Sequence, residues 1–263
     1  MQLTGTTALL TGASGGLGQA IARALSERGV RLLLTGRRRD VLEALATETG
    51  GRAVVADLVQ PGAAESLVAD CDPVDLLVAN AALPGGGPLD RVGAGDAARA
   101  LDVNFRSPVL LAHALLPGML ERRRGHLVFV SSLQGLSATP AAPLYVATKF
   151  GLRGFALALR HDLAGTGVGA SVVLPGFVRD AGMFADSGAS LPPGVGTRSP
   201  EQVARATIRA VERNRPEVVV APPALAAGAY LGGLAPGLSE RVQRLLGARR
   251  LAAEVTAGQA GKR

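Results

Sequence analysis

The 263-residue chain has few of the residues that cross-link proteins or bind metals. It contains one cysteine, Cys71, no tryptophan, and three scattered histidines, His113, His126 and His161. A single thiol excludes an internal disulfide framework and favours a reducing compartment. Three dispersed imidazoles and one thiol do not assemble a zinc cluster, so we predict no metal site.

Long apolar runs are also missing. No stretch of about 18 apolar residues occurs, which is the length that a membrane-spanning helix needs. The segment Met1–Gly5 lacks the basic start and the apolar run of a secretion signal. These absences predict a cytoplasmic protein that is neither secreted nor membrane-spanning.

Acidic residues are outnumbered, 21 against 28 basic ones, which gives a formal charge of +7. The excess is uneven, because residues 237–263 hold six basic and two acidic side chains and leave only +3 for the first 236 residues. So small an excess on the body argues against a nucleic-acid partner.

What the chain does have is seven short, continuously apolar runs. Such continuity is typical of strands buried on both faces, and the segments between the runs show helical spacing, as at Leu17, Ile21 and Leu25. The alternation predicts an α/β fold, a doubly wound, seven-stranded parallel sheet (Rossmann-like) with helices on both faces. The runs are Thr7–Leu10, Leu32–Thr35, Ala53–Ala56, Leu76–Ala79, Leu127–Val130, Ser171–Leu174 and Val218–Val220.

Two segments depart from the alternation. Phe177–Ser199 is rich in Gly, Pro, Ser and Asp, which predicts a mobile loop with a short helix. Residues 223–263 predict a basic amphipathic C-terminal helical extension to a main domain at 1–222, and we expect Gly258–Arg263 to be frayed. In this extension one helical face carries Leu238, Val242, Leu245 and Leu246, with the arginines elsewhere.

In an open parallel sheet, ligands bind beyond the carboxyl ends of the strands. The first run is followed there by glycines at positions 12, 16 and 18. Glycine lets a phosphate reach the backbone N–H groups at a helix N-terminus, so we interpret the turn as a pyrophosphate cradle, with a plain tight turn as the alternative. The cradle would comprise Gly12, Ser14, Gly15, Gly16, Leu17 and Gly18.

Gly36-Arg37-Arg38-Arg39 follows the second run, where an NAD-binding fold usually places a carboxylate. No acid precedes Asp40, and a guanidinium binds a 2′-phosphate bidentately. The pattern therefore favours NADP(H), with Arg37 as the leading contact, while NAD(H) remains open. A solvated basic helix start is the alternative interpretation.

Asp57-Leu58 and Asn80-Ala81 follow the third and fourth runs. Both pairs suit the adenosine edge of a dinucleotide. Asp and Asn also cap helices and turns, so each pair has this structural alternative.

Ser132 follows the fifth run, and Tyr145 and Lys149 lie thirteen and seventeen residues further on. The chain has two tyrosines and two lysines, so this Tyr-x3-Lys spacing arises by chance in roughly one or two such chains in a hundred. On a helix the two side chains share a face. An ammonium beside a phenol lowers the phenol pKa from about 10, which makes Tyr145 a usable general acid and base.

Together these motifs resemble the short-chain dehydrogenase/reductase family over residues 4 to about 222. The resemblance implies that Tyr145 exchanges a proton with the substrate oxygen, that Ser132 hydrogen-bonds this oxygen, and that Lys149 holds the nicotinamide ribose and lowers the Tyr145 pKa. It also implies that Asn104 holds a relay water, although an ordinary helix-kink Asn is the alternative, and that Pro175, Gly176 and Val178 wall the nicotinamide pocket. The matching motifs are Thr11-Gly12-x3-Gly16-x-Gly18, Asn80-Ala81, Asn104, Ser132, Tyr145-x3-Lys149 and Pro175-Gly176.

Three positions depart from the family pattern. Ala79-Asn80-Ala81-Ala82 replaces the usual Asn-Asn-Ala-Gly, and Asp180 replaces a Thr that commonly contacts the nicotinamide carboxamide. An ionised Asp accepts a hydrogen bond but does not donate one, although it can still take the carboxamide NH2. Ser14-Gly15 occupies the place where NADP-selecting members often carry a basic residue.

The leading hypothesis is an NADP(H)-dependent oxidoreductase that interconverts a ketone or aldehyde and its alcohol. The alternative is a non-catalytic dinucleotide-binding sensor or scaffold that docks a partner or a membrane through its C-terminal helices. For this extension, packing in an oligomer ranks ahead of peripheral membrane contact.

The predicted substrate is a small, moderately hydrophobic carbonyl or alcohol compound, because apolar residues line the segment after the sixth run. The apolar surfaces of the helices at Asp96–Arg122 and Leu144–Leu163 predict a homodimer or homotetramer. The apolar residues of the segment are Phe177, Met183, Phe184 and Leu191.

Overall fold

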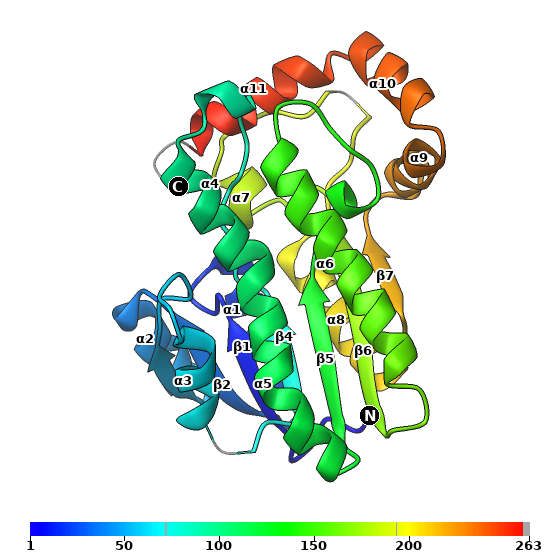
Figure 1. Cartoon of the computed structure of the whole chain (residues 1–263). Coiled ribbons are helices and arrows are strands. Elements are labelled where there is room, and N and C mark those ends of the chain that lie inside the picture. Colours follow the sequence, from blue (N-terminus) through cyan, green and yellow to red (C-terminus); the bar gives the residue numbers. More distant parts are fainter. Residues whose placement is uncertain (72, 193, 260–263) are drawn as a thin grey trace.

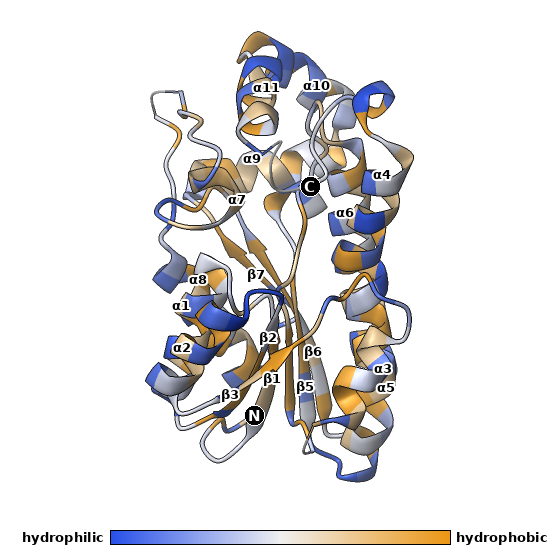
Figure 2. Ribbon diagram, turned by 90° about the vertical axis from the view of Figure 1, so that its left-hand side faces the viewer, coloured by the Kyte–Doolittle hydropathy of each residue, from blue (hydrophilic) through white to orange (hydrophobic). Residues whose placement is uncertain are grey.

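The computed structural model describes residues 1–71, 73–192 and 194–259. In this part of the chain, helices cover both faces of one central sheet (Figures 1 and 2). The strands are β1 (Thr7–Thr11), β2 (Arg31–Gly36), β3 (Arg52–Val55), β4 (Leu76–Ala79), β5 (Gly125–Val130), β6 (Val168–Pro175) and β7 (Glu217–Val220).

The sheet is parallel throughout, with the strand order β3-β2-β1-β4-β5-β6-β7. This confirms the predicted seven-stranded doubly wound fold. The chain builds outward from β1 to β3 and then returns to place β4 on the other side of β1. Leu9 of β1 therefore pairs with Leu33 on one side and Leu77 on the other. A ligand cleft is expected where the winding reverses, beyond the carboxyl ends of β1 and β4.

The helices form the two outer layers. Figure 2 shows α1, α2 and α8 on one face of the sheet and α3, α5 and α6 on the other. They are α1 (Gly16–Ser26), α2 (Arg39–Thr49), α3 (Ala63–Ala69), α4 (Ala94–Leu101), α5 (Ser107–Glu121), α6 (Pro143–Asp162), α7 (Gly182–Ala185), α8 (Pro200–Glu212), α9 (Pro223–Leu234), α10 (Pro236–Leu245) and α11 (Ala248–Gly258), with 3-10 turns η1 (Leu89–Arg91) and η3 (Leu133–Gly135) and a π-helix η2 (Asp102–Arg106).

Each face of the sheet has its own apolar core. Ile21 and Leu25 of α1 pack on one face, and Leu111 and Leu152 of α5 and α6 pack on the other. Because both faces are covered, β1, β4, β5 and β6 are buried along their whole length. Full burial of a leucine or isoleucine side chain stabilises the fold by about 1.5–3 kcal/mol, so these layers stabilise the sheet whose strand ends carry the site.

Five strands begin earlier than the sequence predicts, β2, β3 and β7 by one residue and β5 and β6 by two and three. β5 starts at Gly125 and not at Leu127, and β6 starts at Val168 and not at Ser171, because Gly125, His126 and Gly169 interrupt the apolar pattern but still pair across the sheet. The side chains of His126 and Ser171 meet in the interior, where His126 Nε2 and Ser171 Oγ are 2.8 Å apart. Buried polar residues whose hydrogen bonds are made inside the core thus break the apolar pattern, and hydropathy alone places the strand starts too late.

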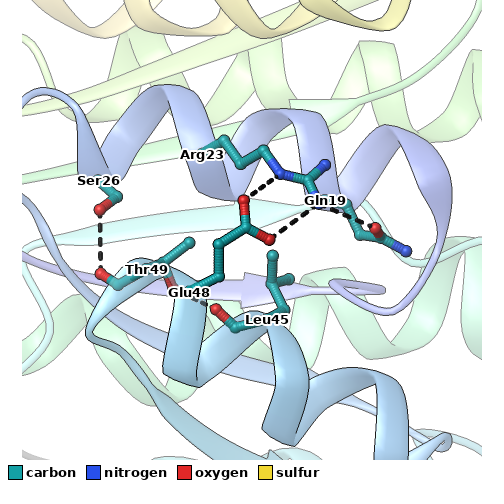
Figure 3. A network of polar contacts seen from close by, with 6 residues as sticks. All are labelled: Gln19, Arg23, Ser26, Leu45, Glu48 and Thr49. Carbon is teal, nitrogen blue, oxygen red and sulfur yellow. Dashed lines mark hydrogen bonds and ion pairs between the residues drawn. The ribbon is translucent and has the colours of Figure 1, made fainter.

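Polar contacts fix α1 against α2 on their shared face (Figure 3). The Arg23 guanidinium donates two hydrogen bonds to the Glu48 carboxylate, at 2.6 and 3.0 Å, and Ser26 Oγ donates to the Thr49 carbonyl oxygen at 3.0 Å. The carboxylate raises the pKa of Arg23, and the guanidinium lowers the pKa of Glu48. Because the ion pair is solvent-exposed, we infer that it orients α1 relative to α2 and adds little to the free energy of unfolding.

The segment after β6 contains the short helix that the sequence predicts, α7. Its ends are held together because the Arg198 N–H donates to the Phe177 carbonyl oxygen at 2.9 Å and the Arg179 N–H donates to the Arg198 carbonyl oxygen at 3.0 Å. We call residues 177–199 the insert. It is therefore a loop whose two ends are joined by backbone hydrogen bonds.

The C-terminal extension forms α9, α10 and α11, which lie beyond the carboxyl end of the sheet (Figure 1). The expectation of fraying is wrong for Gly258 and Gln259, because α11 includes Gly258 and the buried Gln259 donates from Nε2 to the Met183 carbonyl oxygen at 3.0 Å. Residues 260–263 lie outside the described residues. Within the described ranges, no helix is both long and apolar enough to cross a membrane.

Candidate active site

A cleft of about 780 Å³ opens at the switch point between β1 and β4. Every residue that the sequence proposes for catalysis or cofactor binding, except Asn104, lines it. The lining therefore brings together Gly12, Ser14, Gly15, Gly16, Leu17, Gly18, Arg37, Asp57, Leu58, Asn80, Ala81, Ser132, Tyr145, Lys149, Pro175, Gly176 and Val178.

The glycine turn is shaped by close backbone contacts. Gly12 has φ +65°, and a Cβ there would lie 2.8 Å from the Ala81 Cα. A Cβ on Gly18 would overlap the Gly12 carbonyl oxygen. Helix α1 begins directly after this turn, at Gly16, so its free N–H groups face the cleft and form a site suited to an anion.

Asn80 ties the end of β4 to this turn. Its Nδ2 donates to the carbonyl oxygens of Thr11 and Gly12 at 3.1 and 3.3 Å, while Thr11 Oγ1 accepts from the N–H groups of Asn80 and Ala81, both at 3.0 Å. The Asn80 side chain therefore orients the turn as well as lining the cleft. Thr11 is part of the motif found in the sequence, but the sequence gives no sign that its hydroxyl joins the end of β4 to the glycine turn.

The basic segment after β2 reaches the glycine turn through Arg38. Its guanidinium donates to the Ser14 carbonyl oxygen, and both Arg37 and Arg38 line the cleft. Arg38 thus places a positive charge beside Ser14-Gly15, where the sequence lacks a basic residue. The sequence predicts Arg37 as the leading contact and gives the adjacent Arg38 no separate role, whereas in the structure Arg38 is the arginine that reaches the glycine turn.

Asp57 makes the turn contact that the sequence leaves open as an alternative. Its Oδ1 accepts from the Val59 N–H at 3.2 Å, and the residue also lines the cleft. The neighbouring Leu58 carbonyl oxygen accepts from Ser107 Oγ at 2.8 Å, which anchors this rim to the start of α5. Asp57 can therefore hold the turn after β3 and face a ligand in the cleft at the same time.

Ser132, Tyr145 and Lys149 meet at one wall of the cleft. Tyr145 lies in the first turn of α6, and Lys149 follows one turn later. Ser132 caps η3, where its Oγ accepts from the Gln134 N–H at 3.1 Å. The Lys149 Nζ lies 5.5 Å from the centre of the Tyr145 ring and donates to the Val130 carbonyl oxygen at 2.9 Å.

Burial has the largest effect on the pKa values of Tyr145 and Lys149. It raises the pKa of Tyr145 to about 12, against the lowering effect of a hydrogen bond with Ser132. Burial also lowers the pKa of Lys149 to about 8. The predicted lowering of the Tyr145 pKa by Lys149 is wrong for this structure, because the ammonium is directed to a backbone carbonyl and desolvation of the phenolate outweighs its field.

Asn104 lies behind the cleft, fully buried in the π-helix between α4 and α5. Its Oδ1 accepts from the Leu83 N–H at 2.6 Å, and its Nδ2 donates to the Leu83 carbonyl oxygen at 2.9 Å. Leu83 lines the cleft. Asn104 therefore acts on the site by holding the loop after β4, and both ends of its amide are engaged in doing so.

The segment after β6 forms the opposite wall. A Cβ on Gly176 would lie 3.1 Å from the Leu133 Cδ1, so a larger residue would press on η3. Asp180 adopts φ +66°, and its Oδ2 lies 3.2 Å from the Arg179 Nε. The carboxylate that replaces the family threonine is therefore partly neutralised by its neighbour.

The insert supplies apolar lining over the glycine turn. Met183 and Phe184 line the cleft, whereas Phe177 instead packs on Phe184 with ring centres 4.9 Å apart. Leu191, which the sequence also proposes, is not among the lining residues described. A Cβ on Gly16 would lie 2.5 Å from the Ala181 Cβ, a contact that no local motif predicts.

A doubly wound parallel sheet whose switch-point cleft combines a glycine turn with serine, tyrosine and lysine side chains defines the class of Rossmann-type oxidoreductases. The family profile described as short chain dehydrogenase matches residues 6–191. The chain belongs to this family, the short-chain dehydrogenases/reductases, which confirms the resemblance inferred from the motifs.

Curated relatives and solved structures agree with this assignment. The ketoacyl reductase HetN of a Nostoc species is 34% identical over 227 residues, covering 83% of this chain and 79% of that protein. The Bos taurus dehydrogenase/reductase SDR family member 7B is 33% identical over 259 residues, with 89% and 79% covered. A 3-oxoacyl (acyl-carrier-protein) reductase from Agrobacterium tumefaciens, solved with NADP bound, superposes with a TM-score of 0.75 at 28% identity, covering 83% of this chain and 93% of that one.

Proposed function

We propose that this chain is an NADP(H)-dependent oxidoreductase that interconverts a ketone or aldehyde and its alcohol, with Tyr145 as the general acid and base. The observation that carries the proposal is the convergence of Ser132, Tyr145 and Lys149 on the cleft into which the glycine turn opens. A simple nucleotide-binding module has no need of this set. The relative named as a ketoacyl reductase supports carbonyl chemistry.

The residues present fit a dinucleotide. The N-terminus of α1 would take the pyrophosphate, and Arg37 and Arg38 would pair with a 2′-phosphate. All seven residues line the cleft, where Asp57-Leu58 and Asn80-Ala81 would contact the adenosine and Pro175, Gly176 and Val178 would contact the nicotinamide. When bound, the cofactor supplies or accepts the hydride at the substrate carbon. The NADP-bound solved relative supports this choice.

In this proposal Tyr145 is the group that exchanges a proton with the substrate oxygen. With its pKa raised to about 12, the phenol is protonated at neutral pH and is ready to donate. In the reducing direction its proton goes to the substrate oxygen as the carbonyl carbon gains a hydride, and the product is the alcohol. Ser132 would hold that oxygen, and the Lys149 ammonium would stabilise the resulting phenolate.

A relay of protons to Tyr145 would involve Asn104 through its backbone. Its side-chain amide is engaged by Leu83, so a relay water would have to be held by the main chain of the π-helix. A π-turn changes the regular i to i−4 hydrogen-bond pattern and is frequent at functional sites. The Asn104 side chain would then be a positioning group.

The substrate would be small and moderately hydrophobic, because Met183 and Phe184 line its side of the cleft. We also retain the division into a catalytic unit at 1–222 and an extension at 223–263. The partly apolar surface of α5 and α6, with Leu120 and Phe150 exposed, supports a homodimer or homotetramer. Light scattering that reports a monomer at micromolar concentration would contradict this assembly.

The test compares NADPH and NADH binding by titration and then screens a carbonyl panel with the tighter cofactor. We expect NADPH to bind more tightly, and the Tyr145→Phe variant to bind it normally while kcat falls by about a hundredfold to ten-thousandfold. Ser132→Ala should also lower kcat. Absence of turnover across the panel, with tight NADPH binding, would favour the non-catalytic sensor instead.

A further inference from the structure

The large apolar side chains that remain exposed are concentrated in one short stretch. Of the twelve that the described chain exposes, seven lie between Tyr230 and Leu246, and the other five are scattered from Val55 to Phe150. Leu234 and Leu245 are 83% and 87% exposed. Single exposed apolar residues are ordinary, whereas a cluster of them marks a docking surface.

These side chains face outward because the opposite face of each helix already packs on the segment after η3. On α9 the inward residues are Ala229 and Gly232, and a Cβ on Gly232 would overlap the Ser137 hydroxyl. On α10 the Gln243 Nε2 donates to the Ala138 carbonyl oxygen at 2.9 Å. We name the outward set the apolar ridge: Leu231, Leu234, Leu238, Val242, Leu245 and Leu246.

The ridge lies among basic side chains. Glu240 is the only acidic residue between Val218 and Ala253, whereas α10 and α11 carry four arginines. Glu240 pairs with Arg244 at 2.5 Å, and Glu254 pairs with Arg250 at 3.1 Å. Arg241 and Arg249 are exposed and have no ion-pair partner within the described residues.

The positive charge around the ridge distinguishes between two occupants, a second copy of this chain and a lipid bilayer. A second copy meeting it about a two-fold axis would bring arginines against arginines, because the same patch would face itself. A bilayer with anionic headgroups offers both an apolar layer for the leucines and opposite charge for the guanidinium groups. Figure 2 shows α10 and α11 alternating hydrophobic and hydrophilic residues at the end of the molecule away from the N-terminus.

We propose that α9 and α10 dock this protein on an anionic lipid bilayer. The two helices lie in the interface with the apolar ridge inserted among the acyl chains, and Arg241 of α10 and Arg249, in the first turn of α11, pair with headgroup phosphates. Binding of this kind is peripheral and reversible, since it combines modest apolar burial with electrostatic attraction.

Co-sedimentation of the full chain with vesicles tests the proposal. We expect binding to phosphatidylcholine vesicles that contain phosphatidylglycerol, and at least about tenfold weaker binding to phosphatidylcholine alone. The Leu234→Glu/Leu245→Glu variant should lose at least about tenfold in partitioning to the anionic vesicles. The control variant Val55→Glu/Leu89→Glu alters two exposed apolar residues outside the ridge and outside α5 and α6, and should bind like the wild type.

The charge contribution has its own matched pair of variants. Arg241→Ser/Arg249→Ser should weaken binding to anionic vesicles by at least about tenfold, and added salt should weaken wild-type binding likewise. Arg205→Ser/Arg213→Ser removes two exposed arginines of the main domain and should change it little. Unchanged melting temperatures would show that all four variants are folded. Leu234→Ser/Leu245→Ser is the milder substitute for the ridge variant if Glu prevents folding.

Three results would overturn the proposal. Wild-type protein that stays in the supernatant with anionic vesicles would do so directly. Equal binding by the ridge variant and the wild type would show that another surface is responsible. A ridge variant that falls from dimer to monomer in light scattering, with no vesicle binding by the wild type, would assign the ridge to a second copy of this chain.

Discussion

A basic side chain is buried at each end of the parallel sheet, and the two side chains differ in their charge at neutral pH. At the amino end, His126 pairs with Ser171, and burial lowers the His126 pKa to about 3, so the ring stays neutral. At the carboxyl end, Lys149 is 2% exposed with a pKa of about 8, so it is largely charged at neutral pH while buried beside Tyr145.

If the proposed function holds, the difference separates a part of the core that only stabilises the fold from a part that also takes part in catalysis. A neutral imidazole with its hydrogen bond satisfied costs little in the interior. A buried ammonium lowers the free energy of unfolding, and such a cost persists where the charge has a use. Changes at the carboxyl end should therefore affect activity most, and changes at the amino end should affect stability alone.

The largest effect is expected from Lys149→Met. Activity should fall by at least about a hundredfold, because the phenolate of Tyr145 loses its counter-charge. The folded pKa of Lys149, about 8, lies below the ordinary value of 10.5, so the protonated form disfavours folding below about pH 8 and the penalty disappears as pH rises toward 10.5. At neutral pH the variant should thus gain up to about 3 kcal/mol in urea unfolding. A variant less stable than wild type at neutral pH would contradict this account.

Gly18→Ala should affect both binding and stability at the carboxyl end. Its Cβ would overlap the Gly12 carbonyl oxygen, so the turn must shift, at a cost of about 1–3 kcal/mol. Thermal unfolding and NADPH titration measure the two effects. Gly95→Ala in α4 has open space around the new Cβ and should gain a few tenths to about 1 kcal/mol. Equal responses of the two variants would mean that the turn is not under steric constraint.

His126 predicts acid sensitivity at the amino end. Its folded pKa, about 3, lies below the ordinary 6.5, so its contribution to stability is present above pH 6.5 and is lost as pH falls toward 3. Between about pH 7.5 and about pH 5 the wild type should lose about 2 kcal/mol through this group. His126→Gln should show a flatter profile in the same window, measured by urea unfolding. Parallel profiles would assign the acid sensitivity to other groups.

The smallest effect is expected at Gln259, which links α11 to the insert. Gln259→Ala removes the hydrogen bond to the Met183 carbonyl oxygen and should cost about 1 kcal/mol locally. Because Met183 lines the cleft, KM for the carbonyl substrate should rise several-fold while kcat changes little. Steady-state kinetics, with limited proteolysis of the insert, checks this. An unchanged KM together with unchanged cleavage would show that α11 does not hold the insert.

The fold was largely predictable from the sequence because strands buried on both faces leave continuous apolar runs, and the residues after them keep characteristic types. The glycine turn and the Tyr145-Lys149 spacing are local, so their places in the cleft followed once the sheet was recognised. Contacts between segments distant in sequence were not predictable. Arg38 on the Ser14 carbonyl oxygen and Gln259 on the Met183 carbonyl oxygen both depend on how separate segments pack.

The sequence by itself determined the parallel sheet, the family and the set of polar residues at the strand ends, since periodicity and short-range spacing encode all three. Tertiary structure alone decided where Lys149 directs its ammonium, which arginine touches the glycine turn, and that the leucines of α9 and α10 stay outside. The physical reason is that burial and hydrogen bonding depend on every neighbour in space, and hydropathy along the chain does not record which neighbours those are.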